Sequence, residues 1–164
     1  MRRLDIKQIT LALIISSLTL TLTGCSGAGP NASTRLIKQV TDGAEAKITS
    51  DGNDLRMVNT LLVATEDGSA VVVGTIVNAA ETADTLLGIY AGGTQAKITG
   101  ETTLNQNQPI IFEGDSATTK GVFAGVGAEP GKHVTVTFAF ARAGKVSLDV
   151  IIRDKRDDYA KVTA

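Results

Sequence analysis

Short runs rich in Val, Ile, Thr and Leu recur from Ala44 onward, and Asp-Gly, Gly-Gly and Pro-Gly turn signals separate them at roughly 8 to 12 residues. No long window shows the period of a helix. The pattern predicts an all-β antiparallel sandwich. The predicted strands are 44–49, 56–64, 70–78, 85–90, 96–100, 109–113, 121–124, 132–141 and 145–153.

The alternation of apolar and polar residues is clearest in the last two strands. One face of the first carries four apolar side chains: Val134, Val136, Phe138 and Phe140. Residues 145–153 alternate in the same way, so one face of this pair of strands should pack on the core and the other should face solvent. Between them, Gly144 suits the positive φ of a short hairpin connection. After Arg153 the chain is charged, and we expect this tail to fray.

The first 24 residues have the charged, apolar and exit regions of an export signal. The apolar run from Ile9 to Leu22 is about 14 residues long, whereas a membrane span needs roughly 20. The exit Leu22-Thr23-Gly24-Cys25 resembles the lipobox of bacterial lipoproteins, which implies diacylglycerol on Cys25 and cleavage before it. The alternative is an ordinary signal with a chance cysteine. Arg2-Arg3 leaves twin-arginine export open beside the general secretory route, which the interrupting Asp5 favours.

These features divide the chain into four parts: a signal peptide (1–24), a lipidated Cys25 with a flexible linker (25–43), a β-sandwich domain (44–154) and a charged C-terminal tail (155–164). We expect the protein to be lipid-anchored on the extracytoplasmic face of the cell membrane. Two or more acyl chains hold a protein there stably, because each buried methylene contributes about 0.8 kcal/mol.

The mature chain has 13 basic and 16 acidic residues once the signal is removed, so it offers nothing that attracts nucleic acid. Cys25 is its only cysteine, which excludes disulfides and thiolate metal sites in the domain. With no Trp, four Phe and two Tyr, the core must be mainly aliphatic.

Three stretches resemble a known family. They are Val73-Gly74-Thr75-Ile76-Val77-Asn78 followed by Asp84-Thr85-Leu86-Leu87-Gly88, the turn Glu129-Pro130-Gly131, and Val134-Thr135-Val136-Thr137-Phe138 leading to Ala143-Gly144-Lys145-Val146. Together they resemble actinobacterial lipoproteins of the LpqE type, which are similar to the periplasmic copper chaperones called PCuAC. The resemblance implies an immunoglobulin-like or cupredoxin-like β-sandwich.

The same resemblance implies where copper ligands would lie. The copper chaperones bind Cu(I) through His and Met, including a His-x-Met pair on one strand. Residues 119–124, which should carry that pair, contain neither residue. The mature chain has one His and one Met, so His133 and Met57 are weak metal candidates and we predict neither a metal site nor a cofactor.

Other chemical motifs have structural explanations. Gly114-Asp115-Ser116 resembles an esterase signature but lacks its Asp-x-x-His partner, and Asp51-Gly52-Asn53-Asp54 starts like a calcium loop without a closing Glu. Asn78 and Asp84 bracket a connecting turn, where short polar side chains bond backbone amides. We predict no catalytic residue.

The remaining hypothesis is a non-enzymatic accessory protein that docks onto an envelope or respiratory membrane protein. The LpqE-type resemblance implies the cytochrome bcc–aa3 respiratory supercomplex as that partner. Two alternatives stay open. One is a copper chaperone or metal carrier for cytochrome oxidase assembly, using His133, Met57 and carboxylates. The other is a carrier of a small apolar ligand inside the sandwich.

Overall fold

A computed structural model describes residues 41–164. The signal peptide, the lipobox and Cys25 lie outside the described residues. Thr41–Ala164 forms one compact unit that contains its own hydrophobic core, so we expect this unit to fold by itself. Among the described residues, no helix has the length and apolarity to cross a membrane.

Eleven strands make up the described unit, and the predicted all-β class is confirmed. They are β1 (Ala44–Ile48), β2 (Leu55–Ala64), β3 (Ala70–Asn78), β4 (Asp84–Ala91), β5 (Thr94–Gln95), β6 (Lys97–Gly100), β7 (Thr103–Leu104), β8 (Ile110–Ile111), β9 (Thr119–Phe123), β10 (His133–Phe140) and β11 (Lys145–Arg153). The predicted strand 109–113 is wrong in extent, because only two of its residues pair. Two short strands, β5 and β7, were not predicted.

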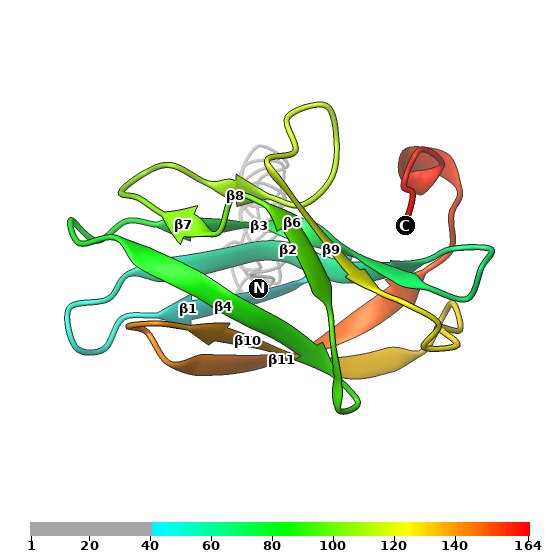
Figure 1. Ribbon diagram of the computed structural model, residues 1–164, viewed down its shortest axis with the longest axis horizontal. Helices are drawn as coiled ribbons and strands as arrows, with labels where there is room; N and C mark the ends of the chain where they lie inside the picture. The colour runs from blue at the N-terminus through cyan, green and yellow to red at the C-terminus, as the bar shows by residue number, and fades with distance from the viewer. Residues whose placement is uncertain (1–40) are drawn as a thin grey trace, which may run out of the picture. The chain divides into compact units, whose positions relative to one another are not determined.

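The strands form one continuous sheet that wraps around a shared interior (Figure 1). Its order is β5-β4-β10-β11-β2-β3-β9-β6, with β1 on β2, β7 on β4 and β8 on β3. Only Ala96 separates β5 from β6, so a single stretch of chain joins the two outer strands. The sandwich is therefore nearly closed, like a barrel, and few backbone groups remain unpaired at its edges.

The interior is filled by the inward residues of these strands, most of them aliphatic. Its largest fully buried side chains include Phe112, Phe123 and Phe138. Burying one such side chain stabilises the fold by roughly 1.5–3 kcal/mol. The alternation read from residues 133–140 places Val136, Phe138 and Phe140 inside, as predicted.

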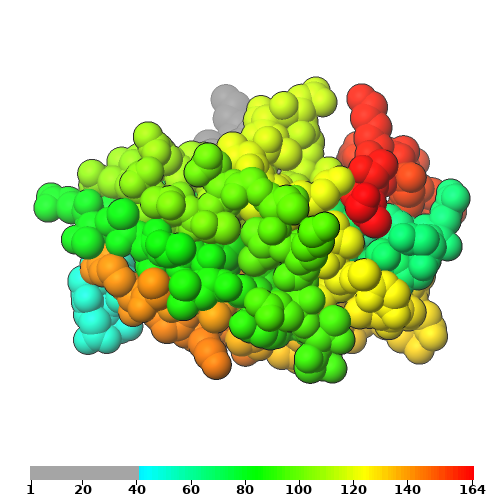
Figure 2. Space-filling view, viewed as in Figure 1, coloured from blue at the N-terminus to red at the C-terminus, as the bar shows by residue number. Residues whose placement is uncertain are grey.

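A second apolar cluster lies on the outer face of the sheet, where the C-terminal segment covers it. Residues 61–63 and 71–73 are apolar at every position, so β2 and β3 carry apolar side chains on the outer face of the sheet as well as on its inner face. A 3₁₀ turn, Asp157–Tyr159, brings Val162 onto that face, where it is 4% exposed. The red C-terminal segment lies against the teal turn that joins β2 to β3 (Figure 2). The expectation of a frayed tail is thus wrong, because the C-terminal segment packs on the apolar outer face and removes it from water.

One end of the barrel is closed by a buried carboxylate. Asp84 is 3% exposed, and its Oδ1 accepts hydrogen bonds from the backbone N–H groups of Thr85 (2.7 Å) and Arg142 (2.8 Å). Its Oδ2 accepts from the N–H of Ala143 (3.0 Å). The anion therefore holds the β10–β11 hairpin onto the start of β4. Gly144 in that hairpin has φ of 77°.

Asn78 bonds the neighbouring loops at the same end. It is 1% exposed, and its Nδ2 donates to the carbonyl groups of Thr82 (2.9 Å) and Leu104 (2.8 Å). Its Oδ1 accepts from the N–H of Ala80 (3.0 Å). Both residues of the predicted bracket thus act on backbone groups.

Asp84→Ala should lower the free energy of unfolding by about 2–4 kcal/mol, because it leaves three partly buried backbone N–H groups without their acceptor. Urea denaturation of residues 41–164 measures this. Asp115→Ala, at an exposed carboxylate, is the control and should shift stability by less than about 0.5 kcal/mol. Equal effects of the two variants would contradict the structural role of Asp84.

Candidate functional site

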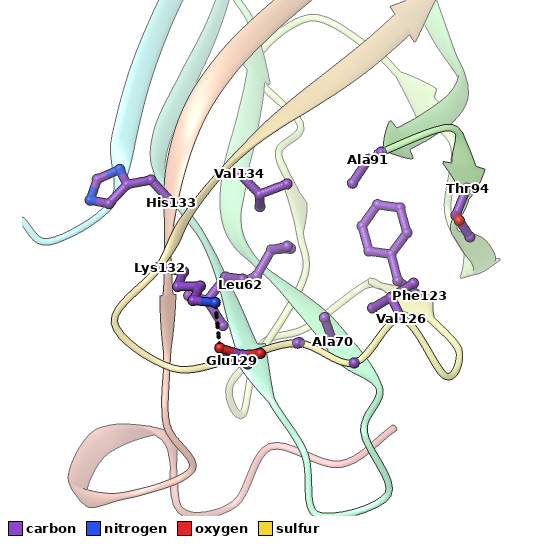
Figure 3. A pocket seen from close by; sticks show the side chains of 14 residues that line it. Leu62, Ala70, Ala91, Thr94, Phe123, Val126, Glu129, Lys132, His133 and Val134 are labelled. Carbon is purple, nitrogen blue, oxygen red and sulfur yellow. Dashed lines mark ion pairs between the residues drawn. The ribbon is translucent and has the colours of Figure 1, made fainter.

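The opposite end of the barrel is open and holds a cavity of about 310 Å³ (Figure 3). We call this the barrel mouth. Widely separated segments of the described chain form it: the ends of β4, β9 and β11, the starts of β3, β5 and β10, the C-terminal part of β2, and the loop 124–132. Its lining residues are Leu62, Ala70, Ala91, Gly92, Thr94, Phe123, Val126, Gly127, Ala128, Glu129, Lys132, His133, Val134 and Ile152.

The floor of the barrel mouth is the hydrocarbon of the core itself. Leu62, Ala70, Phe123 and Ile152 line it, and each is at most 7% exposed. The mouth is therefore a shallow depression over the core and does not run through the barrel. The part of a molecule that rests on this floor would contact aliphatic and aromatic side chains.

The rim is held in place by hydrogen bonds between two loops. The N–H of Gly127 donates to the carbonyl of Gly68 (3.0 Å), and the N–H of Gly125 donates to Ser69 Oγ (3.4 Å). Asp67 braces the same turn by accepting from the hydroxyl of Thr65, and this hydrogen bond together with those from Ser69 lowers the pKa of Asp67. The opening therefore has a defined shape.

Opposite charges sit together on the rim. Lys132 Nζ lies 2.5 Å from Glu129 Oε2, and both side chains are about two-thirds exposed (Figure 3). Because the two groups neutralise one another, the rim presents no net charge to a molecule entering the mouth. The hydroxyl of Thr94 is the polar group on the β5 side.

The two weak metal candidates lie apart. Met57 is 2% exposed inside the core, whereas His133 is on the outer face with its side chain 55% exposed and its Nδ1 3.2 Å from Asp149 Oδ2. His133 is paired with Ile151 of β11, and the next residue, Ile152, is paired with Leu62 of β2. Met57 is five positions before Leu62 in β2, a separation of roughly 16 Å at 3.3 Å per residue. The two residues cannot ligate one ion.

The strand expected to carry the His-x-Met pair is packed with hydrocarbon. It is β9, where Gly121 and Phe123 face inward. A Cβ on Gly121 would meet Val72 Cγ2 at 3.1 Å and Ile89 Cδ1 at 3.3 Å, so neighbouring side chains fill the space that a ligand side chain would use. Among residues 41–164, no three His, Cys, Asp or Glu side chains are grouped to hold a metal ion.

A second cavity, of about 680 Å³, lies between the C-terminal segment and the loop that begins at Glu113. Its walls include Asp115, Asp157 and Asp158. Glu113 is largely buried there, with Lys120 Nζ 3.9 Å from its Oε1. Burial raises the pKa of Glu113, and the charge of Lys120 opposes that effect only in part. Asp115 belongs to the Gly-Asp-Ser stretch, which forms a turn here.

Sequence reasoning missed the barrel mouth. Its residues come from segments far apart in the chain, so no local spacing connects them. One signal was available: the loop after β9 has three glycines with positive φ, at Gly125, Gly127 and Gly131. Such a loop follows a path that other residues resist, and Val126 between the first two is an exposed apolar side chain.

Comparisons with known proteins agree with this fold. No protein-family model and no curated protein matches the sequence. Solved structures do match. The apo PCuAC domain from PmoF1 is 24% identical, with a TM-score of 0.55 over 68% of this chain and 99% of that one. The copper-bound PCuAC domain from PmoF2 is 16% identical, with a TM-score of 0.56 over 68% of this chain and 98% of that one.

The apo PCuAC domain from PmoF2 has a TM-score of 0.52 and 15% identity, over 70% of this chain and 96% of that one. At these identities the likeness concerns the fold. The predicted cupredoxin-like sandwich is therefore confirmed, as is its structural relation to PCuAC domains.

The buried carboxyl of Glu113 gives a pH-dependent prediction. Its pKa is raised in the folded state, so the folded chain keeps this proton to higher pH than the unfolded chain does. Stability therefore falls as the pH rises from the ordinary pKa of glutamate to the raised pKa of the folded state. Glu113→Gln should raise the melting temperature at pH 7. The gain should vanish below about pH 4, where glutamate is protonated in both states.

Thermal unfolding followed by circular dichroism between pH 3 and 8 measures this difference. The exposed Glu101→Gln is the matched control, with no expected gain at pH 7. A stabilisation by Glu113→Gln that persists unchanged at pH 3 would contradict an electrostatic cause.

Proposed function

We propose that this protein is a non-enzymatic binding protein, tethered to the extracytoplasmic face of the membrane through acylated Cys25. In this proposal it docks onto an envelope or respiratory membrane protein. The observation that carries the proposal is a PCuAC-type fold in which His133 and Met57 are separated while one end of the barrel presents an open apolar mouth.

The described residues also argue against acid–base catalysis. His133 pairs with Asp149, and an enzyme would add a nucleophile to such a pair. On the same face, Thr135 lies directly opposite Asp149, and the hydroxyls of Thr137 and Ser147 bond to one another at 2.8 Å. Both members of the His133–Asp149 pair are more than half exposed, so water surrounds the imidazole.

The position where the described chain begins favours a role close to the membrane. Asp42 forms an ion pair with Arg153 (3.2 Å), and Arg153 follows Ile152 of the barrel mouth. The chain therefore enters the domain at the same end as the mouth. The residues between Cys25 and Thr41 span at most about 55 Å even when fully extended, so an anchor at Cys25 would keep the mouth within that distance of the lipid.

The LpqE-type resemblance names a specific partner, the cytochrome bcc–aa3 respiratory supercomplex. If that partner is correct, a mild-detergent pull-down from membranes of the native host should recover its subunits with the wild-type protein. Cys25→Ser, expressed at an equal level, should recover far less, because the untethered protein is no longer concentrated at the membrane. Failure to recover any respiratory subunit with the wild type would exclude this partner.

Copper carriage is the second candidate function, and the similarity to a copper-bound PCuAC domain favours it. The separation of Met57 from His133 argues against it. Titration of residues 26–164 with Cu(I) against a competing chelator should show no tight stoichiometric binding. His133→Ala should leave the titration unchanged. Tight one-to-one binding that His133→Ala abolishes would establish the copper carrier instead.

A further inference from the structure

We propose that the barrel mouth binds an uncharged amphiphile through a compact apolar group of about a dozen heavy atoms. This inference rests on the proposed function, because it identifies what a membrane-held binding protein would hold. The observations behind it are the size of the cavity, its hydrocarbon floor, its electrically neutral rim and its place beside the chain entry.

The size of the cavity limits the ligand. An apolar protein cavity of about 150 Å³ accepts a benzene ring. The barrel mouth has about 310 Å³, at the lower end of the range for ligand pockets. Two fused or linked rings, or a branched aliphatic group of similar size, would fill it. A longer chain would project out of the opening.

The floor determines which part of the ligand enters. Phe123, Leu62 and Ile152 offer no hydrogen bond, so a polar or charged group placed against them would lose its hydration without compensation. The apolar end of the ligand must therefore face inward. In Figure 3 the side chain of Ala91 points toward the ring of Phe123, and these two residues bound the space on the β4 side.

The rim determines the charge of the ligand. Glu129 and Lys132 lie 2.5 Å apart and satisfy one another. An anion would have to displace Glu129 from Lys132, and a cation would have to displace Lys132 from Glu129, so the intact pair disfavours both. An uncharged polar group can use the hydroxyl of Thr94 or the exposed atoms of the pair without breaking it.

The rim is also preorganised for binding. The contacts of Gly127 with Gly68 and of Gly125 with Ser69 fix the loop on one side of the opening. The N–H of Gly131 donates to the carbonyl of Ile152 (2.7 Å) and fixes the other side. A ligand therefore meets a formed site and does not have to order a loop on binding, a cost that weakens many complexes.

The place of the mouth indicates the source of the ligand. Because Asp42 is paired with Arg153 next to the mouth, an anchored chain would present this opening within reach of the lipid surface. Molecules with a compact apolar end and an uncharged polar end are concentrated at that surface. The membrane is therefore the source to which we assign the ligand.

A fluorescent probe tests the site. N-phenyl-1-naphthylamine is uncharged, has linked aromatic rings and gains emission in apolar surroundings. Residues 26–164 should bind one equivalent with saturable, blue-shifted emission. Ala91→Phe, which places a ring in the cavity, should weaken binding by at least about tenfold, equivalent to about 1.4 kcal/mol. Ala141→Phe, at an exposed position near the closed end, should bind like the wild type.

Circular dichroism shows whether Ala91→Phe is still folded. Charge variants on the exposed rim give a second test of the site that does not depend on Ala91→Phe. The anionic analogue 1-anilinonaphthalene-8-sulfonate should bind the wild type at least about tenfold more weakly than the neutral probe. Glu129→Gln, which leaves Lys132 unpaired, should strengthen binding of the anionic probe severalfold, and Lys132→Gln should not. Binding of the neutral probe that is absent, or that no mouth variant alters, would overturn the proposal.

These outcomes are separable from those of the proposed function. The probe experiment uses the unacylated chain and does not depend on Cys25 or on any partner. Loss of respiratory subunits from the pull-down with normal probe binding would reject the docking partner and retain the site. Normal recovery of those subunits with no probe binding would reject the ligand site and retain the docking role.

Discussion

Closure of the sheet around one aliphatic core is the constraint on which the rest of this structure depends. Ala96 is the corner: residues on one side of it pair with β4, and those on the other side pair with β9. Its N–H donates to the carbonyl of Ile89 (2.8 Å), and its side chain is 5% exposed. Without this crossing, β4 and β9 would present open edges to other chains. A domain with no disulfide depends on such closure.

Closure also makes the two ends of the barrel different. At one end, the buried Asp84 and Asn78 bond backbone groups of the β3–β4 and β10–β11 connections and of strands β4 and β7, so the strands are held together. At the other end, Leu62 and Phe123 belong to the core and lie directly under the opening. The buried anion at the first end is stable only when fixed N–H groups donate to it. The hydrocarbon floor at the second end makes no hydrogen bonds, so either water or a ligand can lie against it. This contrast locates the candidate site.

Local alternation predicted most of the strands, because each side chain reports which face it occupies. It predicted the pairing of β10 with β11 and the inward Phe138. It could not predict β5 and β7, since two paired residues carry no period. The tail was misjudged from its charges, although Leu61 and Val63 on the outer face of β2 already required a cover such as Val162. The mouth is assembled from separate segments, so only the folded chain brings it together.

The interior of this chain can be compared with the requirements of a metal site, because its fold is similar to that of PCuAC domains. A metal site inside a sandwich needs polar or sulfur ligands, which carry a desolvation cost when the ion is absent. Here Gly121 gives its space to Val72 and Ile89, and Met57 packs as a core residue. Hydrocarbon side chains thus fill the space next to β9 where a ligand side chain would lie. A binding role on this fold is better served by surfaces that remain open, and in the described chain the barrel mouth combines openness, apolar character and a position beside the chain entry.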